Sequence, residues 1–491
     1  MQLYDKDLLS VQEVRELVEK AKVAQKELAA MSQEQVDEIV RSVAFAGVRN
    51  AKRLAKMAHE ETGFGIEADK VIKNVFGSFS VYERIKDLKT IGEIERDEER
   101  KTRTLAVPVG IVAGLIPSTN PTSTAFFKSE IALKGGNAII FTPHPNAKNC
   151  IVEAVKVIRT AIAEAGGNED LVAVITTPTV QATDTLMKHP EVSMILATGG
   201  SAMVRSAYSS GTPAIGVGPG NGPAYIDKSA DLKVAVKRIL DSKTFDNGTI
   251  CASEQSVMCD TDMEPAVRAE MEKQGAYFLT DEQIAKLGKF ILRANGTMNP
   301  QIVGKSAKVI AELAEIEIPE GTRVLVAKEN GIGRGHPYSN EKLAPILAFY
   351  TADNYKACCE MACDILRYEG AGHTFSMHCY DQEIIDYFAE RVPASRVMVN
   401  TPSALGGIGG STGMMPSLTL GCGAIGGSAT SENVGPLHLI NKRVVAEGLV
   451  ELEDIRKAAA DEIASPCKPA AAPGFDVDAL VAEIVKRLQA I

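Results

Sequence analysis

The sequence contains no tryptophan, few aromatic residues and none of the long apolar segments that mark membrane or secreted proteins. Its 491 residues are 5% aromatic but 45% apolar, so small aliphatic side chains must fill most of the core. No apolar run approaches the ~18 residues that a membrane span needs. The N-terminus, MQLYDKDLLS, lacks the basic and apolar regions of a secretory signal. We therefore expect an intracellular protein with no membrane partner.

Positive charge is also scarce. The chain carries 53 Lys and Arg against 63 Asp and Glu, which gives a net charge of −10. The most charged run, Glu95–Arg103, mixes both signs and is typical of a solvated face. Proteins that bind nucleic acid neutralise its phosphates with lysine and arginine. The composition therefore predicts no nucleic-acid partner.

Cysteine is present at ordinary density, without the spacing of a disulfide framework or a zinc site. The nine cysteines are an odd number, which favours a reducing cytosol. Cys358, Cys359 and Cys363 cluster without a nearby histidine. We therefore predict no metal site.

Short apolar runs alternate with amphipathic helices over most of the chain, whose length suggests roughly three domains of about 150 residues. Helices are expected first, over Val11–Met31 and Val36–Ala51. The alternation then runs from Ile111 to Ile226 and again from Leu240 to Ser431. Strands that alternate with helices in this way form βαβ units. The fold class is therefore α/β, with two doubly wound, Rossmann-like domains of mostly parallel sheet.

The last 27 residues differ from the rest in composition. Ser465–Gly474 is a linker rich in proline and alanine, and Phe475–Ile491 is a short amphipathic helix with one apolar face. An isolated helix of this length is marginally stable in water, so the apolar face needs a partner. That partner is either another protein or the helix's own domain, and the flexible tether favours another protein.

Cys251 is the candidate nucleophile. It lies in the segment TFDNGTICASE, where glycine and small residues allow a turn that brings the thiol and a backbone N–H toward one space. Taken alone, such a cysteine is more often a small buried apolar residue.

Three further segments follow predicted strands, where ligands of doubly wound sheets bind. Asn120, in PSTNPTST, can direct its amide N–H groups at a developing oxyanion, or it can simply form an Asn-Pro turn. The glycines after Thr198 precede a helix, where backbone N–H groups favour a phosphate. His144 ends another strand and, taken alone, is more often structural or solvated.

Together these segments resemble one family, the aldehyde dehydrogenases, and within it the CoA-acylating branch found in bifunctional aldehyde–alcohol dehydrogenases and bacterial microcompartments. The segments that carry the resemblance are PSTNPTSTAFFKSEIALKGGNAIIFTPHP, ILATGGSAMVRSAYSSGTPAIGVGPGNGPAYID, SKTFDNGTICASEQSV, EKLAPILAFY and GHTFSMH.

The resemblance implies a role for nine residues. It makes Cys251 the nucleophile and Asn120 the residue that stabilises the oxyanion. It implies that the NAD pyrophosphate binds at the turn of Thr198, Gly199 and Gly200. It also implies that the adenine ribose lies near the strand end at Thr142, Pro143 and His144, and that Glu341 holds the nicotinamide ribose. Glu254, His373 and His378 receive no role.

One departure from the family decides the expected product. Hydrolytic members carry a glutamate 34 residues before the nucleophile, where it activates water; Val217 stands there in this sequence. Without that base, a thioester on Cys251 survives until another thiol attacks it, and the thiol of CoA is far more acidic than water. The resemblance therefore implies NAD-dependent oxidation of a short aldehyde, such as acetaldehyde or propionaldehyde, to acyl-CoA, with CoA as co-substrate. The alternatives are a hydrolytic enzyme with a displaced base and an assembly component that acts through its last helix.

The resemblance also implies an organisation and partners. Residues 1–235 would form the NAD-binding domain with an oligomerisation hairpin near 97–110, and 236–430 the catalytic domain. Residues 431–464 would return to the first domain and supply an oligomerisation strand near Arg443–Leu449. A homodimer or homotetramer is expected. Residues 465–491 look like an encapsulation peptide, which places the enzyme in the cytoplasm, inside a bacterial microcompartment, with shell or cargo proteins as partners of Phe475–Ile491.

Overall fold

The computed structural model describes residues 5–293 and 296–464. The chain divides into two units, described separately here. Unit 1 comprises Met1–Gly92 and Ala106–Lys442, and unit 2 comprises Glu93–Leu105 and Arg443–Ile491. Within the described ranges, none of the helices is both long and apolar enough to cross a membrane.

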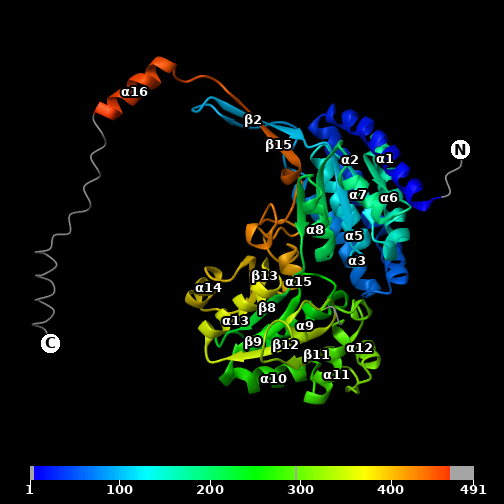
Figure 1. Ribbon diagram of the computed structural model, residues 1–491, viewed down its shortest axis with the longest axis vertical. Helices are drawn as coiled ribbons and strands as arrows, with labels where there is room; N and C mark the ends of the chain where they lie inside the picture. Colours follow the sequence, from blue (N-terminus) through cyan, green and yellow to red (C-terminus); the bar gives the residue numbers. More distant parts are fainter. Residues whose placement is uncertain (1–4, 294–295, 465–491) are drawn as a thin grey trace, which may run out of the picture. The chain divides into compact units, whose positions relative to one another are not determined.

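The first half of unit 1, coloured blue to green in Figure 1, is built on a parallel sheet of five strands in the order β5-β4-β3-β6-β7. The strands are β3 (Ile111–Ile116), β4 (Ala138–Pro143), β5 (Val172–Val174), β6 (Val192–Thr198) and β7 (Ala214–Val217). The helices that alternate with them are α5 (Pro121–Lys134), α6 (Lys148–Glu164), α7 (Val180–Met187) and α8 (Ser201–Ser209). The predicted βαβ alternation is confirmed in this half.

Helices precede this sheet, as predicted, and their ends follow local capping rules. They are α1 (Lys6–Ala29), α2 (Gln33–Thr62), α3 (Glu67–Val75) and α4 (Val81–Ile85), with a π-helical turn between the last two. Ser32 and Gln35 form a capping box at the start of α2, and Gly63 ends that helix in the left-handed region, with φ 64°. The helix predicted over Val36–Ala51 is therefore longer than expected.

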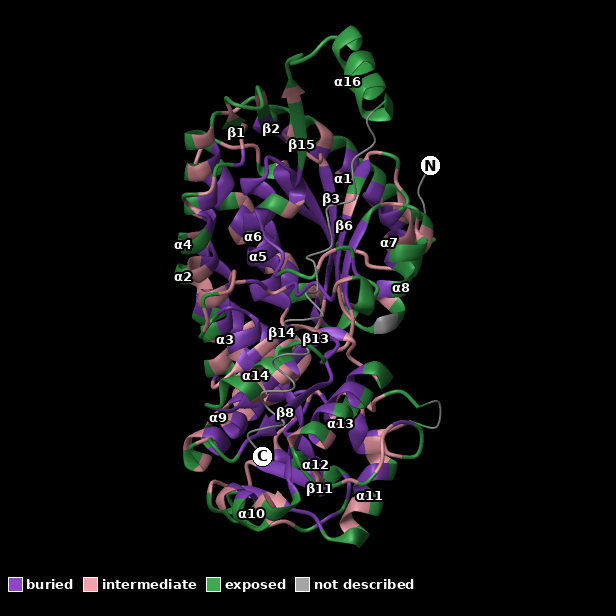
Figure 2. Ribbon diagram, turned by 90° about the vertical axis from the view of Figure 1, so that its left-hand side faces the viewer, coloured by how far each residue is buried: buried purple, intermediate pink, exposed green. Residues whose placement is uncertain are grey.

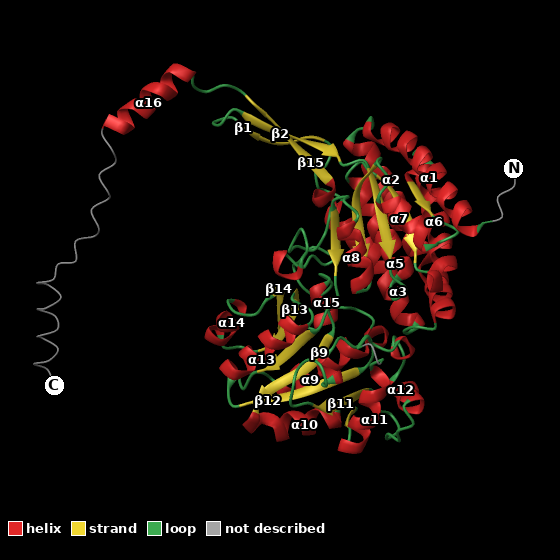
Figure 3. Cartoon of the chain, viewed as in Figure 1, coloured by secondary structure: helices red, strands yellow, loops and turns green. Residues whose placement is uncertain are grey.

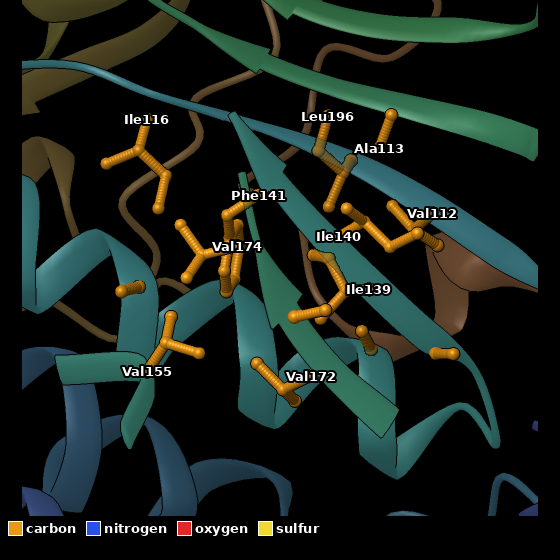
Figure 4. Close-up of a cluster of buried hydrophobic side chains, with 14 of the residues drawn as sticks. Val112, Ala113, Ile116, Ile139, Ile140, Phe141, Val155, Val172, Val174 and Leu196 are labelled. Carbon is orange, nitrogen blue, oxygen red and sulfur yellow. The ribbon is translucent and has the colours of Figure 1, made fainter. Parts of the chain in front are cut away.

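The core of this half lies around β3 and β4, all of whose residues are buried. Strands covered on both faces read as continuous apolar runs rather than alternating ones. Figure 4 shows side chains from these two strands, from β5 and from α6 gathered in one cluster. The labelled members are Val112, Ala113, Ile116, Ile139, Ile140, Phe141, Val155, Val172, Val174 and Leu196. Aliphatic residues thus fill the core, as the shortage of aromatics implies.

The second half of unit 1 is a parallel sheet of seven strands in the order β10-β11-β12-β9-β8-β13-β14 (Figure 3). Its strands are β8 (Gly222–Ile226), β9 (Glu254–Asp260), β10 (Ala276–Phe278), β11 (Val324–Lys328), β12 (Ile346–Ala352), β13 (Gly372–His378) and β14 (Ala394–Val399). Its helices are α9 (Leu232–Thr244), α10 (Glu264–Lys273), α11 (Asp281–Ile291), α12 (Ala307–Leu313), α13 (Tyr355–Tyr368), α14 (Gln382–Ala389) and α15 (Ser403–Gly407).

The change from the first sheet to the second occurs earlier than predicted. The strand at Gly222–Ile226 pairs with β9 and β13 of the second sheet, so the chain leaves the first sheet after Val217 rather than at residue 235. The segment Gly218–Asn221 separates the two strands. A buried parallel strand has the same apolar pattern in either sheet, so the alternation alone could not assign it.

Unit 2 contains most of a sheet of three strands in the order β1-β2-β15. These are β1 (Gly92–Asp97), β2 (Thr102–Pro108) and β15 (Ile440–Ala446), close to the predicted hairpin and strand. A last helix, α16 (Leu452–Ala464), has every residue exposed and is green throughout in Figure 2. The predicted linker and tail helix over 465–491 lie outside the described residues.

Candidate active site

Unit 1 contains a cavity of about 650 Å³ at the carboxyl ends of the strands of the first sheet. Its lining includes the segments after β3, β6 and β7, together with the segment that precedes β9. This is where open α/β sheets bind their ligands. Seven of the nine predicted site residues line it: Asn120, His144, Thr198, Gly199, Gly200, Cys251 and Glu341. The lining does not include Thr142 and Pro143.

Cys251 is carried by a strained turn between α9 and β9. Asp246 and Asn247 have φ of 48° and 52°, and Gly248 follows with φ 75°. A residue other than glycine costs of order 1–3 kcal/mol in such a conformation and needs surrounding contacts to hold it there. The half-buried Cys251 follows three residues later. The position of Cys251 therefore depends on the contacts that hold Asp246 in this conformation.

Helix α3 supplies those contacts. The Asp246 carboxylate accepts hydrogen bonds from Lys70 Nζ at 3.0 Å, Lys73 Nζ at 2.5 Å and the backbone N–H of Ile66 at 2.7 Å. Asp69 accepts from the backbone N–H of Asp246 at 2.7 Å. Burial would raise the pKa of Asp246, but the two ammonium groups outweigh it and lower the pKa. Asp246 is therefore a charged and fully paired buried anion.

Asn120 follows β3 at the start of α5 and meets the same lysine. Its Oδ1 accepts from Lys73 Nζ at 2.6 Å, and its Nδ2 donates to Thr119 Oγ1 at 3.2 Å and to the Thr249 carbonyl at 3.4 Å. Lysine only donates, so the amide oxygen must be the atom facing Lys73. The N–H₂ group is consequently turned toward Thr119 and the segment of Cys251, and it must release one of these two long bonds to donate to an oxyanion.

The Cys251 thiol lies in surroundings that disfavour its ionisation. Burial first, and the Glu341 carboxyl second, raise the pKa of Cys251 to about 12, while Arg396 opposes them. Glu341 is itself affected: burial, and then Glu369, raise its pKa to about 8. In this state the thiol is protonated at neutral pH and needs a further positive charge beside it to ionise.

Two carboxyl groups line the cavity, and both are held by backbone N–H groups. Glu341 Oε1 accepts from Gly220 at 2.8 Å, and Glu369 Oε2 accepts from the N–H of Glu341 at 2.6 Å. Gly220 also lies against the nucleophile, because a Cβ there would overlap the carbonyl oxygen of Cys251. Neither carboxyl stands free.

The wall that contains Val217 is apolar. Val217 ends β7, is 3% exposed and lines the cavity together with Cys251. It belongs to a buried cluster with Ile250, Ala252 and Cys422, against which Cys251 packs. The position that would carry the base of a hydrolytic enzyme therefore faces the cavity with a hydrocarbon side chain.

The turn after β6 has room for a phosphate. Gly200 is the N-cap of α8 without a side-chain cap, and a Cβ on it would meet nothing within 4 Å. Uncapped N–H groups at a helix start bind anions. His144 is half-buried, and its Nδ1 accepts from the backbone N–H of Asn146 at 3.2 Å. Thr142 is buried with its hydroxyl 2.8 Å from that of Thr183, which makes it part of the packing.

Three residues without a predicted role differ in their placement. His373 is buried beside Gly220, with Nδ1 2.9 Å from the hydroxyl of Thr374, and burial lowers its pKa to about 3. Glu254 Oε1 accepts from the backbone N–H of Ser403 at 2.9 Å, and burial raises its pKa to about 7. His378 ends β13, is buried and does not line the cavity.

The sequence analysis missed the buried ions that support the site, namely Lys70, Lys73, Asp246 and Arg396. Arg396 Nη1 donates to the carbonyls of His373 at 3.0 Å and Gly421 at 2.9 Å. Only Asp246 offered a signal, as an acidic residue within the small-residue segment of the nucleophile. Within residues 5–293 and 296–464, no cluster of His, Cys, Asp or Glu could hold a metal ion.

The two parallel sheets, the cysteine after a strained turn and the amide in the same cavity define the class of two-sheet α/β proteins with a candidate thiol nucleophile beside an uncapped helix start. The model of the aldehyde dehydrogenase family matches residues 4–413. The chain belongs to the aldehyde dehydrogenase family.

Two relatives show how this chain compares with named family members. It is 46% identical over 444 residues to the bifunctional aldehyde-alcohol dehydrogenase of Escherichia coli strain K12, covering 89% of this chain and 50% of that protein. This chain therefore spans about half the length of that bifunctional relative. It is 40% identical over 428 residues to the succinate-semialdehyde dehydrogenase (acetylating) of Clostridium kluyveri, covering 87% of this chain and 94% of that protein.

Solved structures agree with the fold. A probable aldehyde dehydrogenase from Listeria monocytogenes is 61% identical with a TM-score of 0.91, covering 92% of this chain and 100% of its own. A propionaldehyde dehydrogenase from the fucose utilisation microcompartment of Clostridium phytofermentans is 27% identical with a TM-score of 0.81, covering 88% and 97%. A propionaldehyde dehydrogenase from Rhodopseudomonas palustris, with bound CoA and an acylated cysteine, is 26% identical with a TM-score of 0.79, covering 88% and 97%.

Proposed function

We propose that this protein is a CoA-acylating aldehyde dehydrogenase that converts a short aldehyde, CoA and NAD to acyl-CoA and NADH. The observation that carries the proposal is Val217, which puts a hydrocarbon wall in the cavity of Cys251 where hydrolytic family members carry a base. The acetylating relative named above and the propionaldehyde dehydrogenase with bound CoA and an acylated cysteine support the same chemistry.

The cavity suits a nicotinamide dinucleotide. The turn at Gly199 and Gly200 begins α8 without a side-chain cap and with open space at Gly200, which suits a pyrophosphate, and Glu341 lines the same cavity as Cys251. We propose the turn, His144 and Glu341 as the residues that hold NAD, with Thr142 and Pro143 behind them in β4. When bound, oxidised NAD supplies a hydride acceptor and a positive charge beside the thiol.

The chain's own residues then account for the first half of the reaction. After the Cys251 thiol loses its proton to solvent, its sulfur attacks the aldehyde carbon and forms a C–S bond, while the carbonyl π electrons move to oxygen. Asn120 Nδ2 donates to that oxyanion, and Lys73 holds the amide in the required orientation. When the oxyanion collapses, the C–H electron pair leaves as hydride and a thioester to Cys251 remains.

The second half transfers the acyl group. After the CoA thiol loses its proton to solvent, its sulfur attacks the thioester carbon and forms a new C–S bond, while Asn120 again donates to the oxyanion. The bond from that carbon to Cys251 breaks, and Cys251 leaves as the thiolate. Water is the competing acceptor, and it needs a base to become hydroxide at neutral pH. Glu341 and Glu369 already accept hydrogen bonds from backbone N–H groups. Val217 has a hydrocarbon side chain and cannot act as a base. The acyl group is therefore kept for the thiol.

Product analysis tests the proposal. With acetaldehyde or propionaldehyde and NAD, the enzyme should give one equivalent of NADH per site without CoA, and continuous turnover to acyl-CoA when CoA is added. Quenched samples are separated by chromatography and the acyl-CoA and carboxylate are quantified. Sustained carboxylate formation without CoA would contradict the proposal and identify a hydrolytic enzyme.

We further propose that the protein is a homodimer or homotetramer located in the cytoplasm, inside a bacterial microcompartment. Strand β15 is an edge strand, and its Val444 exposes 61% of its surface, which suits pairing with a second copy. The amphipathic pattern of Phe475–Ile491 and the microcompartment relative support encapsulation. Deleting 465–491 should leave turnover intact but abolish co-purification with shell proteins; loss of turnover would instead indicate that the tail packs on its own domain.

A further inference from the structure

Helix α3 contacts the two halves of the candidate site from one side. Lys73 Nζ reaches Asn120 Oδ1 at 2.6 Å, Asp246 Oδ2 at 2.5 Å and Thr249 Oγ1 at 2.8 Å. Asn120 begins α5 of the first sheet, whereas Asp246 and Thr249 belong to the segment of Cys251. One buried ammonium group therefore connects the oxyanion donor to the nucleophile's turn.

This contact controls both the orientation and the strength of the amide donor. An asparagine amide can flip, because its O and N ends have similar shape. An ammonium group can donate only to the oxygen end, so it fixes which way the amide faces. A charged donor on the oxygen also draws electron density away from the nitrogen, and this polarisation strengthens the N–H groups as donors. Both effects act on the atom that faces the substrate oxygen.

We propose that Lys73 is a positioning residue for the oxyanion, acting through Asn120, an inference that rests on the proposed aldehyde oxidation at Cys251. Lys73 fixes the amide with Nδ2 on the side of Thr119 and the Cys251 segment, at the cavity that Asn120 lines, and polarises it. Because Lys73 is 3% exposed and paired with Asp246, its place is set before substrate arrives. The oxyanion site is therefore preorganised by a residue that does not line the cavity.

Lys70 provides a matched control. It lies on the same helix, is equally buried at 3% exposure and binds the same Asp246 oxygen at 3.0 Å. Its other contact is the carbonyl of Thr119 at 3.3 Å, and no bond to the Asn120 amide is present. Removing either lysine leaves the other to balance Asp246. The two variants therefore differ in whether the Asn120 amide and the Thr249 hydroxyl keep their cationic partner, and the cycle with Asn120→Ala below isolates the amide.

The experiment measures hydride transfer in single-turnover bursts of NADH, without CoA, in Lys73→Met and Lys70→Met. Misplacing a catalytic group by about 1 Å can cost about 100-fold in rate. We expect Lys73→Met to lower the burst rate by about 10- to 100-fold, with the KM for aldehyde changed less than about threefold, and Lys70→Met to lose less than about fivefold. Equal losses in both variants would overturn the proposal, since they would reflect a damaged turn.

A double-mutant cycle with Asn120→Ala completes the test. If Lys73 acts through the amide, adding Lys73→Met to Asn120→Ala should change the burst rate less than about twofold, because the interaction is already lost. If the losses in burst rate of the two single variants multiply in the double variant, the proposal is overturned. If circular dichroism shows that Lys73→Met is unfolded, Lys73→Gln, which keeps a donor but no charge, replaces it in the same cycle. If the wild-type enzyme gives the NADH burst but makes no acyl-CoA, CoA is not the acyl acceptor. The burst rates of the variants would still test the role of Lys73.

Discussion

The cavity of Cys251 has two unlike walls, one made of buried charges and amides and the other of hydrocarbon. On the polar wall, Asn120 lines the cavity and Lys73 and Asp246 lie behind it. On the apolar wall, Val217 packs with Ile250 and neighbouring aliphatic groups. Both walls adjoin the same nucleophile, so any reaction at Cys251 is exposed to both.

The difference explains how one site can favour the thioester and still protect it. Burying a charge is costly unless it is paired, and the polar wall pairs every ion that it contains. Buried, paired ions hold the groups near them in fixed positions, and such groups can stabilise a charge that develops in the transition state. On the apolar wall, any charged base would be unpaired and would activate water. In the proposed reaction, the polar wall promotes formation of the acyl-enzyme, and the apolar wall delays its hydrolysis.

The largest expected effect comes from Cys251, because both walls act on it. Cys251→Ala should abolish the NADH burst and the acyl-CoA product altogether, since no covalent adduct can form. Stopped-flow absorbance at the NADH band measures this directly. Cys422→Ala, which changes a thiol of the apolar cluster, should keep a burst. A burst that persists in Cys251→Ala would show that another group is the nucleophile.

The polar wall should account for the next largest effect. Asn120→Ala removes an oxyanion donor, a change that costs about 100- to 1,000-fold in kcat in comparable sites. We expect a loss of that size in kcat for aldehyde oxidation. Thr119→Ala serves as the comparison, because it removes a hydroxyl that accepts a bond from the Asn120 amide but keeps the Thr119 carbonyl that binds Lys70, and its loss in kcat should be much smaller. Similar losses in the two variants would show that the amide has no special role.

The apolar wall can be tested by giving it a base. Val217→Glu should create slow formation of carboxylate without CoA and lower the acyl-CoA yield by about tenfold, because a carboxylate beside the thioester can activate water. Val217→Gln has the same shape without the base and should lower the rate without producing carboxylate. Chromatography of the products distinguishes the two. Equal carboxylate from both variants would attribute hydrolysis to disturbed packing.

The sequence and the fold agree best where a pattern is local and repeated. The βαβ alternation placed the strands of the first sheet within a few residues, because each strand is a short apolar run between helices. The same pattern misassigned Gly222–Ile226, since a buried parallel strand looks alike in either sheet. Sheet membership depends on long-range pairing with β9 and β13, which no local window contains.

The candidate site divides in a similar way. Residues of recognisable segments, such as Cys251, Asn120 and Glu341, could be proposed from the sequence, and the structure brings them to one cavity. Lys73 could not, because its partner Asp246 lies 173 positions away and a helical lysine ordinarily faces solvent. A buried ion pair is formed by tertiary structure, so Lys73 carries no local signal of its partner.

Two buried carboxyl groups, those of Asp246 and Glu254, should change the stability of the protein in opposite directions. Asp246 has two ammonium partners and a lowered pKa, whereas burial raises the pKa of Glu254 from 4.5 to about 7. A raised pKa in the folded state gives stability that is present below about pH 4.5 and lost as pH rises to about 7. Glu254→Gln should therefore gain stability relative to wild type over this range, by at most about 3 kcal/mol. Asp246→Asn should show the opposite sign, with a loss of stability that stays constant from pH 5 to 8 and shrinks only as pH falls below the ordinary Asp value of 3.8. Urea denaturation of the full chain at pH 5, 6, 7 and 8 measures both, and a difference between Glu254→Gln and wild type that does not vary with pH would show that Glu254 does not titrate in this range.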